Sequence, residues 1–314
     1  MKWVVRILLI LVLLAVAAGA AGYLLLPKSI LVERTAVIER PAHSVSAWLA
    51  TIPPKHAFTQ GVTETVQTLA ENRVESVIDL GKGRAEMVYE LTPSPTGVSV
   101  KLRATRQFGG DLLARLDAAS GKDGLEAKVD AGFTALTAEL NALPTFDFSG
   151  LQYSVEDVAA RPFIFLEAST KQAAENIKNA MRQSLPLVRT AIETNNLKVA
   201  GPPIAVETNW ADGRYEFRAG LPYSGEAPEL FGVKVGSTPA GRALRVAYMG
   251  TEENVIPTYD QIESLIIASR LKRAGPSFEI YLDDPTQESG SVKREIYYLI
   301  EGNDSALAKI PAAK

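Results

Sequence analysis

The sequence contains no cysteine and only two histidines, His43 and His56. The absence of cysteine excludes disulfides, zinc sites with cysteine ligands, thiol catalysis and lipid attachment through a thiol. The two histidines fall in different predicted elements, so the usual ligands of a transition metal are almost missing from the chain. We therefore expect no metal site.

Motifs of nucleotide chemistry and of serine hydrolases are also missing. The chain has no Gly-x-Ser-x-Gly elbow, no phosphate-binding loop and no dinucleotide fingerprint. Its formal net charge is −3, which gives no electrostatic reason to bind nucleic acid. The sequence therefore predicts no cofactor and no nucleic-acid partner. Apolar residues make up 46% of the 314 positions and charged residues 22%, which is typical of a globular chain of about two domains.

Long apolar runs are confined to the N-terminus. Trp3–Leu26 carries a single charge, Arg6. About 20 apolar residues suffice to span a bilayer as a helix, and Lys2 and Arg6 ahead of the run favour a cytoplasmic N-terminus. We expect a single-pass anchor through residues 3–26 in the inner membrane, with the remaining chain in the periplasm or outside the cell. The alternative is a cleaved signal peptide that ends in the small residues 15–20.

A sequence pattern recurs in the C-terminal half. Gly201-Pro202 corresponds to Gly275-Pro276, 74 residues on, and Glu216 corresponds to Glu295, 79 residues on. In each copy two strands follow a helix, predicted over 170–196 and 257–273, and each helix follows another strand. The sequence thus predicts a duplicated β-α-β-β unit.

Alternation along these strands separates apolar from polar side chains. Ile280 and Ile296 are expected on the face that packs against the helices. The other face is predicted to be a ligand cleft, formed by Glu295, Tyr297, Glu279, Tyr281, Glu207 and Glu216. Several carboxylates close to aromatic rings attract cations, so the cleft is predicted to hold a small molecule. The alternative is an ordinary solvated sheet face.

Three short stretches support a family resemblance: GVKVG at 232–236, EIY at 279–281 ahead of Asp284-Pro285, and EIY at 295–297. With the two copies, they resemble the GyrI-like effector-binding domain, which also forms the ligand-binding half of some AraC- and MerR-type regulators. The resemblance covers roughly residues 151–302. It implies that a small, often cationic molecule binds between the two halves, with Glu295, or next Glu279, at the centre. Some relatives resemble hydrolases, which implies that Glu295 with Tyr297 or Tyr281 could act as a general base.

The segment 29–143 has a different pattern, which predicts a strand, a short helix, an antiparallel meander and a long helix. The predicted strands cover 29–39, 62–69, 73–79, 84–91 and 98–105, and the helices 41–49 and 125–143. Val129, Phe133, Leu136 and Leu140 form one stripe of the long helix. On residues 32–48 and 132–140 the segment resembles the SRPBCC (START-like) helix-grip fold.

The predicted fold class is α+β. The predicted parts are a transmembrane anchor (1–28), a START-like domain (29–143), a linker (144–150), a GyrI-like domain (151–302) and a flexible tail (303–314). The predicted function is that of a membrane-anchored, extracytoplasmic small-molecule-binding protein. The alternatives are a glutamate- and tyrosine-dependent hydrolase of a small reactive substrate, and a non-catalytic envelope module that binds a protein partner.

Overall fold

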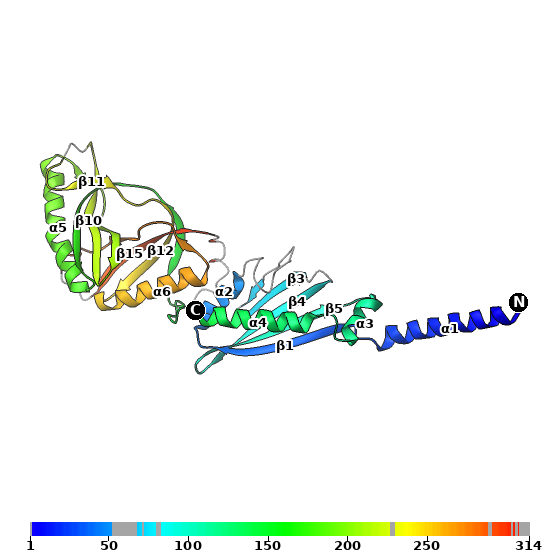
Figure 1. Cartoon of the computed structure of the whole chain (residues 1–314). Coiled ribbons are helices and arrows are strands. Elements are labelled where there is room, and N and C mark those ends of the chain that lie inside the picture. The colour runs from blue at the N-terminus through cyan, green and yellow to red at the C-terminus, as the bar shows by residue number, and fades with distance from the viewer. Residues whose placement is uncertain are drawn as a thin grey trace. The chain divides into compact units, whose positions relative to one another are not determined.

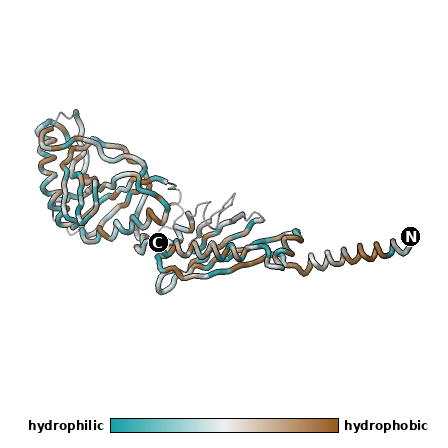
Figure 2. Tube along the Cα trace, in the orientation of Figure 1, coloured by the Kyte–Doolittle hydropathy of each residue, from teal (hydrophilic) through white to brown (hydrophobic). Residues whose placement is uncertain are grey.

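The computed structural model describes residues 2–51, 68–70, 72–79, 83–226, 230–287, 291–302, 304 and 307. His56, most of the strand predicted at 62–69 and most of the predicted tail lie outside the described residues. The chain divides into two compact units between Thr145 and Phe146. Hydrophilic and hydrophobic positions are interspersed along the strands of both units (Figure 2).

The first unit is built on one antiparallel sheet and a long helix (Figure 1). Within the described residues of this unit, five strands pair in the order β1-β5-β4-β3-β2. The strands are β1 (Ser29–Ile38), β2 (Thr68–Ala70), β3 (Arg73–Asp79), β4 (Arg84–Ser94) and β5 (Gly97–Gln107). The helices are α1 (Lys2–Leu25), α2 (Ala42–Ala50), α3 (Leu112–Ala119) and α4 (Leu125–Asn141).

The core of the first unit lies between the sheet and α4. The strands β4 and β5 alternate between buried and more accessible residues, as expected when one sheet face packs against a helix. The predicted stripe of Val129, Phe133, Leu136 and Leu140 is buried in the same cluster as Met87 and the other inward residues of the strands. The sequence did not predict α3, which begins after Asp111; the Asp111 carboxylate accepts hydrogen bonds from the first turn of that helix.

Helix α1 occupies the segment for which a membrane anchor is predicted. A membrane-spanning helix needs about 20 predominantly apolar residues. In the part of the chain that the structure describes, no helix combines the length and the apolar character needed to cross a membrane. The predicted anchor through residues 3–26 is therefore wrong. The predicted inner-membrane and periplasmic location is wrong with it, because that prediction rested on the anchor.

The second unit is built on a large antiparallel sheet whose main path runs β11-β7-β10-β9-β14-β15-β12-β6. Two short strands, β8 (Lys198–Val199) and β13 (Lys272–Arg273), pair with β10 and β15 off this path. The other strands are β6 (Tyr153–Val158), β7 (Pro162–Lys171), β9 (Ile204–Ala211), β10 (Arg214–Ser224), β11 (Lys234–Ser237), β12 (Gly241–Gly250), β14 (Phe278–Tyr281) and β15 (Val292–Glu301). The helices are α5 (Ala174–Thr194), the short 3₁₀ helix η1 (Glu252–Asn254) and α6 (Val255–Ala268).

The second unit consists of two halves with the same order of elements. In the first half β7, α5, β9 and β10 follow one another, and in the second half β12, α6, β14 and β15 do so. The halves meet where β9 pairs with β14, with Ile204 opposite Ile280. The centre of the sheet is therefore the boundary between the two halves.

Both faces of this sheet are buried over much of their area. One face packs against α5, whose Met181, Leu185 and Val188 join a cluster with Phe217 and Ala205. The opposite face has a separate cluster, which includes Phe163, Ile204, Phe278, Ile280 and Tyr297. Because each face has an apolar core of its own, alternation alone does not identify the face that binds a ligand.

The register between β14 and β15 does not agree with the predicted faces of these strands. Glu295 pairs with Ile280, and Ile296 pairs with Glu279. Directly opposed residues of an antiparallel pair point to the same face. Glu279 and Tyr281 therefore point to the face that carries the helices, whereas Glu295 and Tyr297 point to the other. The prediction that these four residues share one face is wrong, because Ile280 and not Glu279 shares a face with Glu295.

Candidate functional site

The second unit contains a cavity of about 290 Å³ on the helix-bearing face of the sheet. Its walls come from the beginning of α5, from η1 and α6, and from the central strands β9, β14 and β15. Because both halves contribute, the cavity lies between them. Its lining residues are Gln172, Ala174, Ile177, Glu207, Trp210, Tyr215, Glu252, Val255, Ile256, Tyr259, Asp260, Glu263, Arg273, Ser277, Phe278, Glu279, Arg294, Ile296 and Tyr298.

The cavity lining is rich in negative charge and in aromatic rings. Five carboxylates face two guanidinium groups, so the formal charge of the fully ionised lining is 2 − 5 = −3. The carboxylates belong to Glu207, Glu252, Asp260, Glu263 and Glu279, and the guanidinium groups to Arg273 and Arg294. Trp210, Tyr215, Tyr259 and Tyr298 add aromatic side chains from different elements. Excess negative charge beside ring faces favours a cation over an anion.

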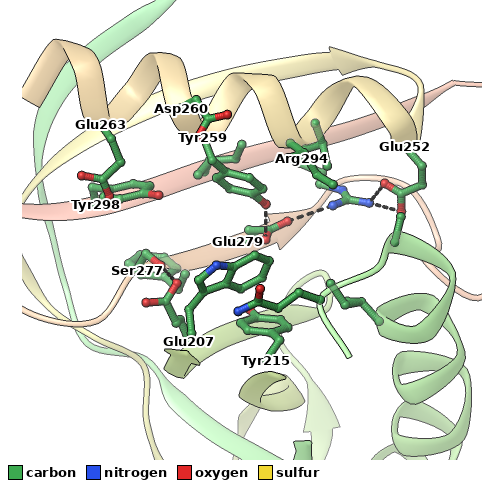
Figure 3. Close-up of a pocket in the computed structure, with 18 of the residues that line it drawn as sticks. Glu207, Tyr215, Glu252, Tyr259, Asp260, Glu263, Ser277, Glu279, Arg294 and Tyr298 are labelled. Carbon is green, nitrogen blue, oxygen red and sulfur yellow. Dashed lines mark hydrogen bonds and ion pairs between the residues drawn. The ribbon is translucent and has the colours of Figure 1, made fainter. Parts of the chain in front are cut away.

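Glu279 lies in the middle of the cavity (Figure 3). One of its oxygens accepts a hydrogen bond from the hydroxyl of Tyr259, and the other accepts one from Nη1 of Arg294 at 3.1 Å. The carboxylate side chain is only 12% exposed. Burial, together with the negative charge of Glu279, raises the pKa of Tyr259 well above its ordinary value of 10.0. Tyr259 therefore stays protonated and remains a hydrogen-bond donor to Glu279.

Arg294 joins Glu279 to one end of the cavity. Its Nη2 atom donates to both carboxylate oxygens of Glu252, and its guanidinium carbon lies 4.7 Å from the centroid of the Tyr281 ring. The Arg294 side chain is only 6% exposed. A buried cation must be matched by counter-charge, which Glu279 and Glu252 supply here. Arg294 thus stabilises this end of the cavity as an internal structural cation.

A second guanidinium lies at the other end. Arg273 donates from Nη2 to Glu207 at 3.0 Å and from Nη1 to Glu263 at 3.3 Å, and its guanidinium carbon lies 4.9 Å from the centroid of the Tyr298 ring. Ser277 donates to the second oxygen of Glu207 at 3.0 Å. Burial raises the pKa of Glu263 above its ordinary value of 4.5, and the charge of Arg273 opposes that shift. The Arg273 side chain is 37% exposed, in contrast to Arg294.

Trp210 forms part of the cavity wall and is also open to solvent. Its residue is 45% exposed, and its ring lies edge-on to that of Tyr215, with the centroids 5.0 Å apart. Tyr215 in turn stacks on Phe217 of the helix-facing core at 4.6 Å. An accessible ring beside buried ones places Trp210 at the mouth of the cavity.

Two of the six predicted site residues, Glu207 and Glu279, line this cavity. Tyr281 lies on the same face but is buried in the core beneath Arg294. Glu216 lies between Tyr215 and Phe217, which point toward the helices, so alternation directs Glu216 to the opposite face. The six predicted residues do not form a single cluster. That they bind a ligand stays a prediction.

Glu295 and Tyr297 interact with each other on the opposite face. The Tyr297 hydroxyl donates to Glu295 at 2.9 Å, and Arg245 forms an ion pair with the same carboxylate. Burial alone would raise the pKa of Glu295, but the hydrogen bonds from Arg245 and Tyr297 outweigh it and lower that pKa overall. The Tyr297 ring stacks on Phe278 at 4.6 Å in the core of that face. Glu295 is thus the partner of an arginine across the sheet from the cavity.

Sequence reasoning missed the two arginines and Glu252 as parts of the site. One signal was available for Arg294. It precedes Ile296 and Tyr298 at intervals of two, so strand alternation places a charged residue on a face expected to be apolar. Such a charge needs buried carboxylate partners, and these are Glu279 and Glu252. No comparable signal identifies Arg273, because a basic residue after a helix is common at helix C-termini.

The described residues contain no group of three or more His, Asp or Glu side chains arranged to hold a metal ion. Four of the five cavity carboxylates, those of Glu207, Glu252, Glu263 and Glu279, accept hydrogen bonds from the chain's own arginines or hydroxyl groups.

Comparison with known proteins relates the second unit to a family of small-molecule-binding domains. Residues 151–301 match the family model of the GyrI-like small molecule binding domain. No curated protein matches the chain.

Three solved structures illustrate the similarity of the chain to known proteins. The C-terminal domain of EcmrR has 12% identity and a TM-score of 0.42, covering 48% of this chain and 98% of that one. SAV2435 bound to tetraphenylphosphonium has 14% identity and a TM-score of 0.37, covering 49% and 96%. A hydrolase from Listeria innocua has 12% identity and a TM-score of 0.33, covering 48% and 92%. At such low identities and TM-scores, these likenesses assign neither a ligand nor an activity to this chain.

The family match covers the duplicated sheet and both helices that enclose the cavity. Residues 1–150 lie outside it. Residues 151–301 are a GyrI-like small-molecule-binding domain.

Proposed function

We propose that the second unit binds a small organic cation in the cavity between its two halves. The observation that carries the proposal is the composition of the lining. Five carboxylates and the rings of Trp210, Tyr215, Tyr259 and Tyr298 surround only two guanidinium groups. A cation over an aromatic ring gains about 0.5–2 kcal/mol, and more where water is excluded. The negative charge of the lining adds a longer-range attraction.

Binding without chemistry is the function that the geometry of Glu279 supports best. Both of its carboxylate oxygens already accept hydrogen bonds, from Tyr259 and from Arg294. These two bonds use about half of the lone pairs of the carboxylate and fix its orientation, whereas a general base must direct a free lone pair at the proton that it removes. Glu279 therefore acts as a fixed counter-charge, and the alternative of a glutamate-dependent hydrolase has weaker support.

For the first unit we propose the START-like helix-grip class, with residues 29–143 as the domain and 144–150 as a linker. The order of β1, α2, the antiparallel strands β2–β5 and then α4 supports this proposal. An experimental structure in which α4 does not cover the sheet would refute it.

The binding proposal is tested with tetraphenylphosphonium, a permanent cation whose charge does not depend on pH. Trp210 is the only tryptophan of the second unit, since Trp3 and Trp48 belong to the first, so its fluorescence reports on the mouth of the cavity. We expect a saturable change in the wild-type protein that is absent in Trp210→Phe. Triphenylphosphine oxide, an uncharged molecule with similar rings, is expected to bind more weakly. Equal affinity for the two molecules would refute a cation site.

A further inference from the structure

The end of the cavity around Arg273 has the composition of a binding site for a planar cation. Glu207 and Glu263 accept hydrogen bonds from the two terminal nitrogens of the guanidinium, and the Tyr298 ring lies beneath its central carbon. Figure 3 shows Glu207, Ser277, Glu263 and Tyr298 together at this end, away from the Arg294–Glu252 pair. Two carboxylates and a ring face recognise any flat cation with N–H donors on two sides.

We infer that these residues form a subsite for a guanidinium or amidinium head group of the ligand, and that Arg273 occupies this subsite in the free protein. The inference rests on the proposed function, because it assigns one end of the same cavity. Arg273 is then a tethered competitor, and the ligand must displace its side chain before the head group can bind.

The difference between the two arginines supports this assignment. Arg294 is 6% exposed and holds Glu279 and Glu252, so its removal would leave buried carboxylates without a counter-charge. Arg273 is 37% exposed and belongs to the two-residue strand β13. Its side chain can turn into solvent without any change in the backbone, and a long arginine side chain regains rotamer freedom when it does so.

The subsite is expected to persist when Arg273 leaves. Ser277 holds one oxygen of Glu207 at 3.0 Å, and the Glu207 amide donates to the carbonyl of Ser277 at 3.0 Å. Tyr298 is fixed in β15, where it pairs with Leu244 of β12. These contacts do not involve Arg273, so the site is pre-organised for another cation of the same shape.

Competition of this kind lowers the apparent affinity by the fraction of molecules in which the subsite is open. If Arg273 occupies the subsite in about nine molecules of ten, its removal raises the affinity for a planar cation about tenfold. A general loss of positive charge would instead favour all cations alike.

The test uses the full chain and two monocations at constant ionic strength. Benzamidinium carries a planar head with N–H donors, and tetramethylammonium has the same charge but no donors. Affinities are measured by isothermal titration calorimetry for wild type, Arg273→Ala and Lys272→Ala. The last variant is the matched control, because it removes one positive charge from the same short strand at a residue that does not line the cavity.

We expect Arg273→Ala to bind benzamidinium about tenfold more tightly than wild type, with Lys272→Ala within about twofold of wild type. The gain for tetramethylammonium should be less than about threefold. Equal benzamidinium affinities in wild type and Arg273→Ala, or equal gains for both cations, would overturn the inference. If Arg273→Ala does not fold, Arg273→Met decides the question, because it keeps an apolar stem over Tyr298.

The experiments distinguish a failure of the Arg273 subsite from a failure of the proposed cation-binding function. Tetraphenylphosphonium has no N–H donors, and its binding to the wild-type protein tests the cavity as a whole. Binding of tetraphenylphosphonium without a gain for benzamidinium in Arg273→Ala would refute the subsite alone. A selective benzamidinium gain without tetraphenylphosphonium binding would support the subsite and refute a site for bulky cations.

Discussion

Replacement of Glu279 by glutamine removes the charge at the centre of the cavity and keeps the shape of the side chain. The glutamine oxygen can still accept a hydrogen bond from Tyr259 or from Arg294, and Arg294 keeps its ion pair with Glu252. We therefore expect Glu279→Gln to fold. The variant changes one quantity that matters for a cationic ligand, which is the negative charge available to it.

The expected loss of affinity follows from the position of the carboxylate. A ligand cation about 5 Å from a unit charge interacts with it by about 3 kcal/mol at an effective dielectric constant of about 20. Arg294 already lies 3.1 Å from Glu279 and partly offsets this attraction. A loss of about 1–3 kcal/mol remains, in line with the scale of a charged hydrogen bond. That corresponds to roughly 5- to 150-fold weaker binding of tetraphenylphosphonium.

The matched control is Glu295→Gln. It makes the same chemical change on the strand that pairs with β14, but on the opposite face, where Glu295 is bound by Arg245 and Tyr297. Arg245 already offsets the charge of Glu295, and the ligand would lie about 10 Å away, beyond the Debye length of about 8 Å, so little attraction to Glu295 remains. Glu295→Gln should therefore leave the affinity within about twofold of wild type. Both variants are compared by calorimetry and by Trp210 fluorescence.

Two results would refute this reasoning. One is an unchanged affinity in Glu279→Gln, provided that the variant unfolds at the same urea concentration as wild type. The other is a larger loss in Glu295→Gln than in Glu279→Gln, which would place the ligand on the face originally predicted from the sequence.

Three further predictions concern stability and pH. Arg294→Met leaves Glu279 and Glu252 without their buried counter-charge, so it should lower the free energy of unfolding by about 3–5 kcal/mol in urea denaturation. Arg273→Met affects a more exposed ion pair and should lower the free energy of unfolding by about 1 kcal/mol or less. Equal losses in the two variants would contradict the different roles of the two arginines. Gly220→Ala should cost about 1–3 kcal/mol, because the added Cβ would lie 2.1 Å from the carbonyl oxygen of Ile164, and a thermal midpoint equal to that of wild type would show that the strands do not pack so closely. Burial raises the pKa of Glu263 above 4.5. Below that raised pKa the carboxyl group is neutral and does not attract a cation, so the affinity for tetraphenylphosphonium should increase as the pH rises through the pKa. Glu263→Gln should flatten this increase. A pH profile that is the same in wild type and Glu263→Gln would remove Glu263 from the site.

Sequence patterns predicted the elements of the second unit well, because strand and helix periods are local properties. The helix predicted over 170–196 is α5 (Ala174–Thr194), and the helix over 257–273 corresponds to α6 (Val255–Ala268). Alternation also correctly placed Glu295 with Tyr297, and Glu279 with Tyr281, within each strand. These assignments follow from the two-residue period of a strand and need no tertiary information.

The register between β14 and β15 could not be predicted from these local patterns. The long connection between Tyr281 and Val292 does not fix which residue of β14 opposes Glu295. A shift by one residue moves every side chain of a strand to the other face relative to its neighbour, and this is the difference between the expected and the observed site. The sequence also favoured a cleft away from the helices, whereas the cavity lies beside them, because polar residues such as Tyr259 and Glu263 interrupt the buried surface of α6.

The N-terminal segment shows a different limit. Its apolar composition was interpreted as a membrane anchor from counts of residues along the chain. The described helices include none with the length and apolar character needed to cross a membrane. Composition of a terminal segment is thus a weaker guide than the spacing of residues within a repeated unit.

The central claim is that the ligand site lies on the helix-bearing face of the sheet, between the two halves. A crystal structure of the full chain with tetraphenylphosphonium tests this claim most directly. The claim predicts density for the cation between α6 and the central strands, in contact with Tyr259 and Glu279. Density for the cation against Glu295 and Tyr297 on the opposite face, with the cavity empty, would contradict it.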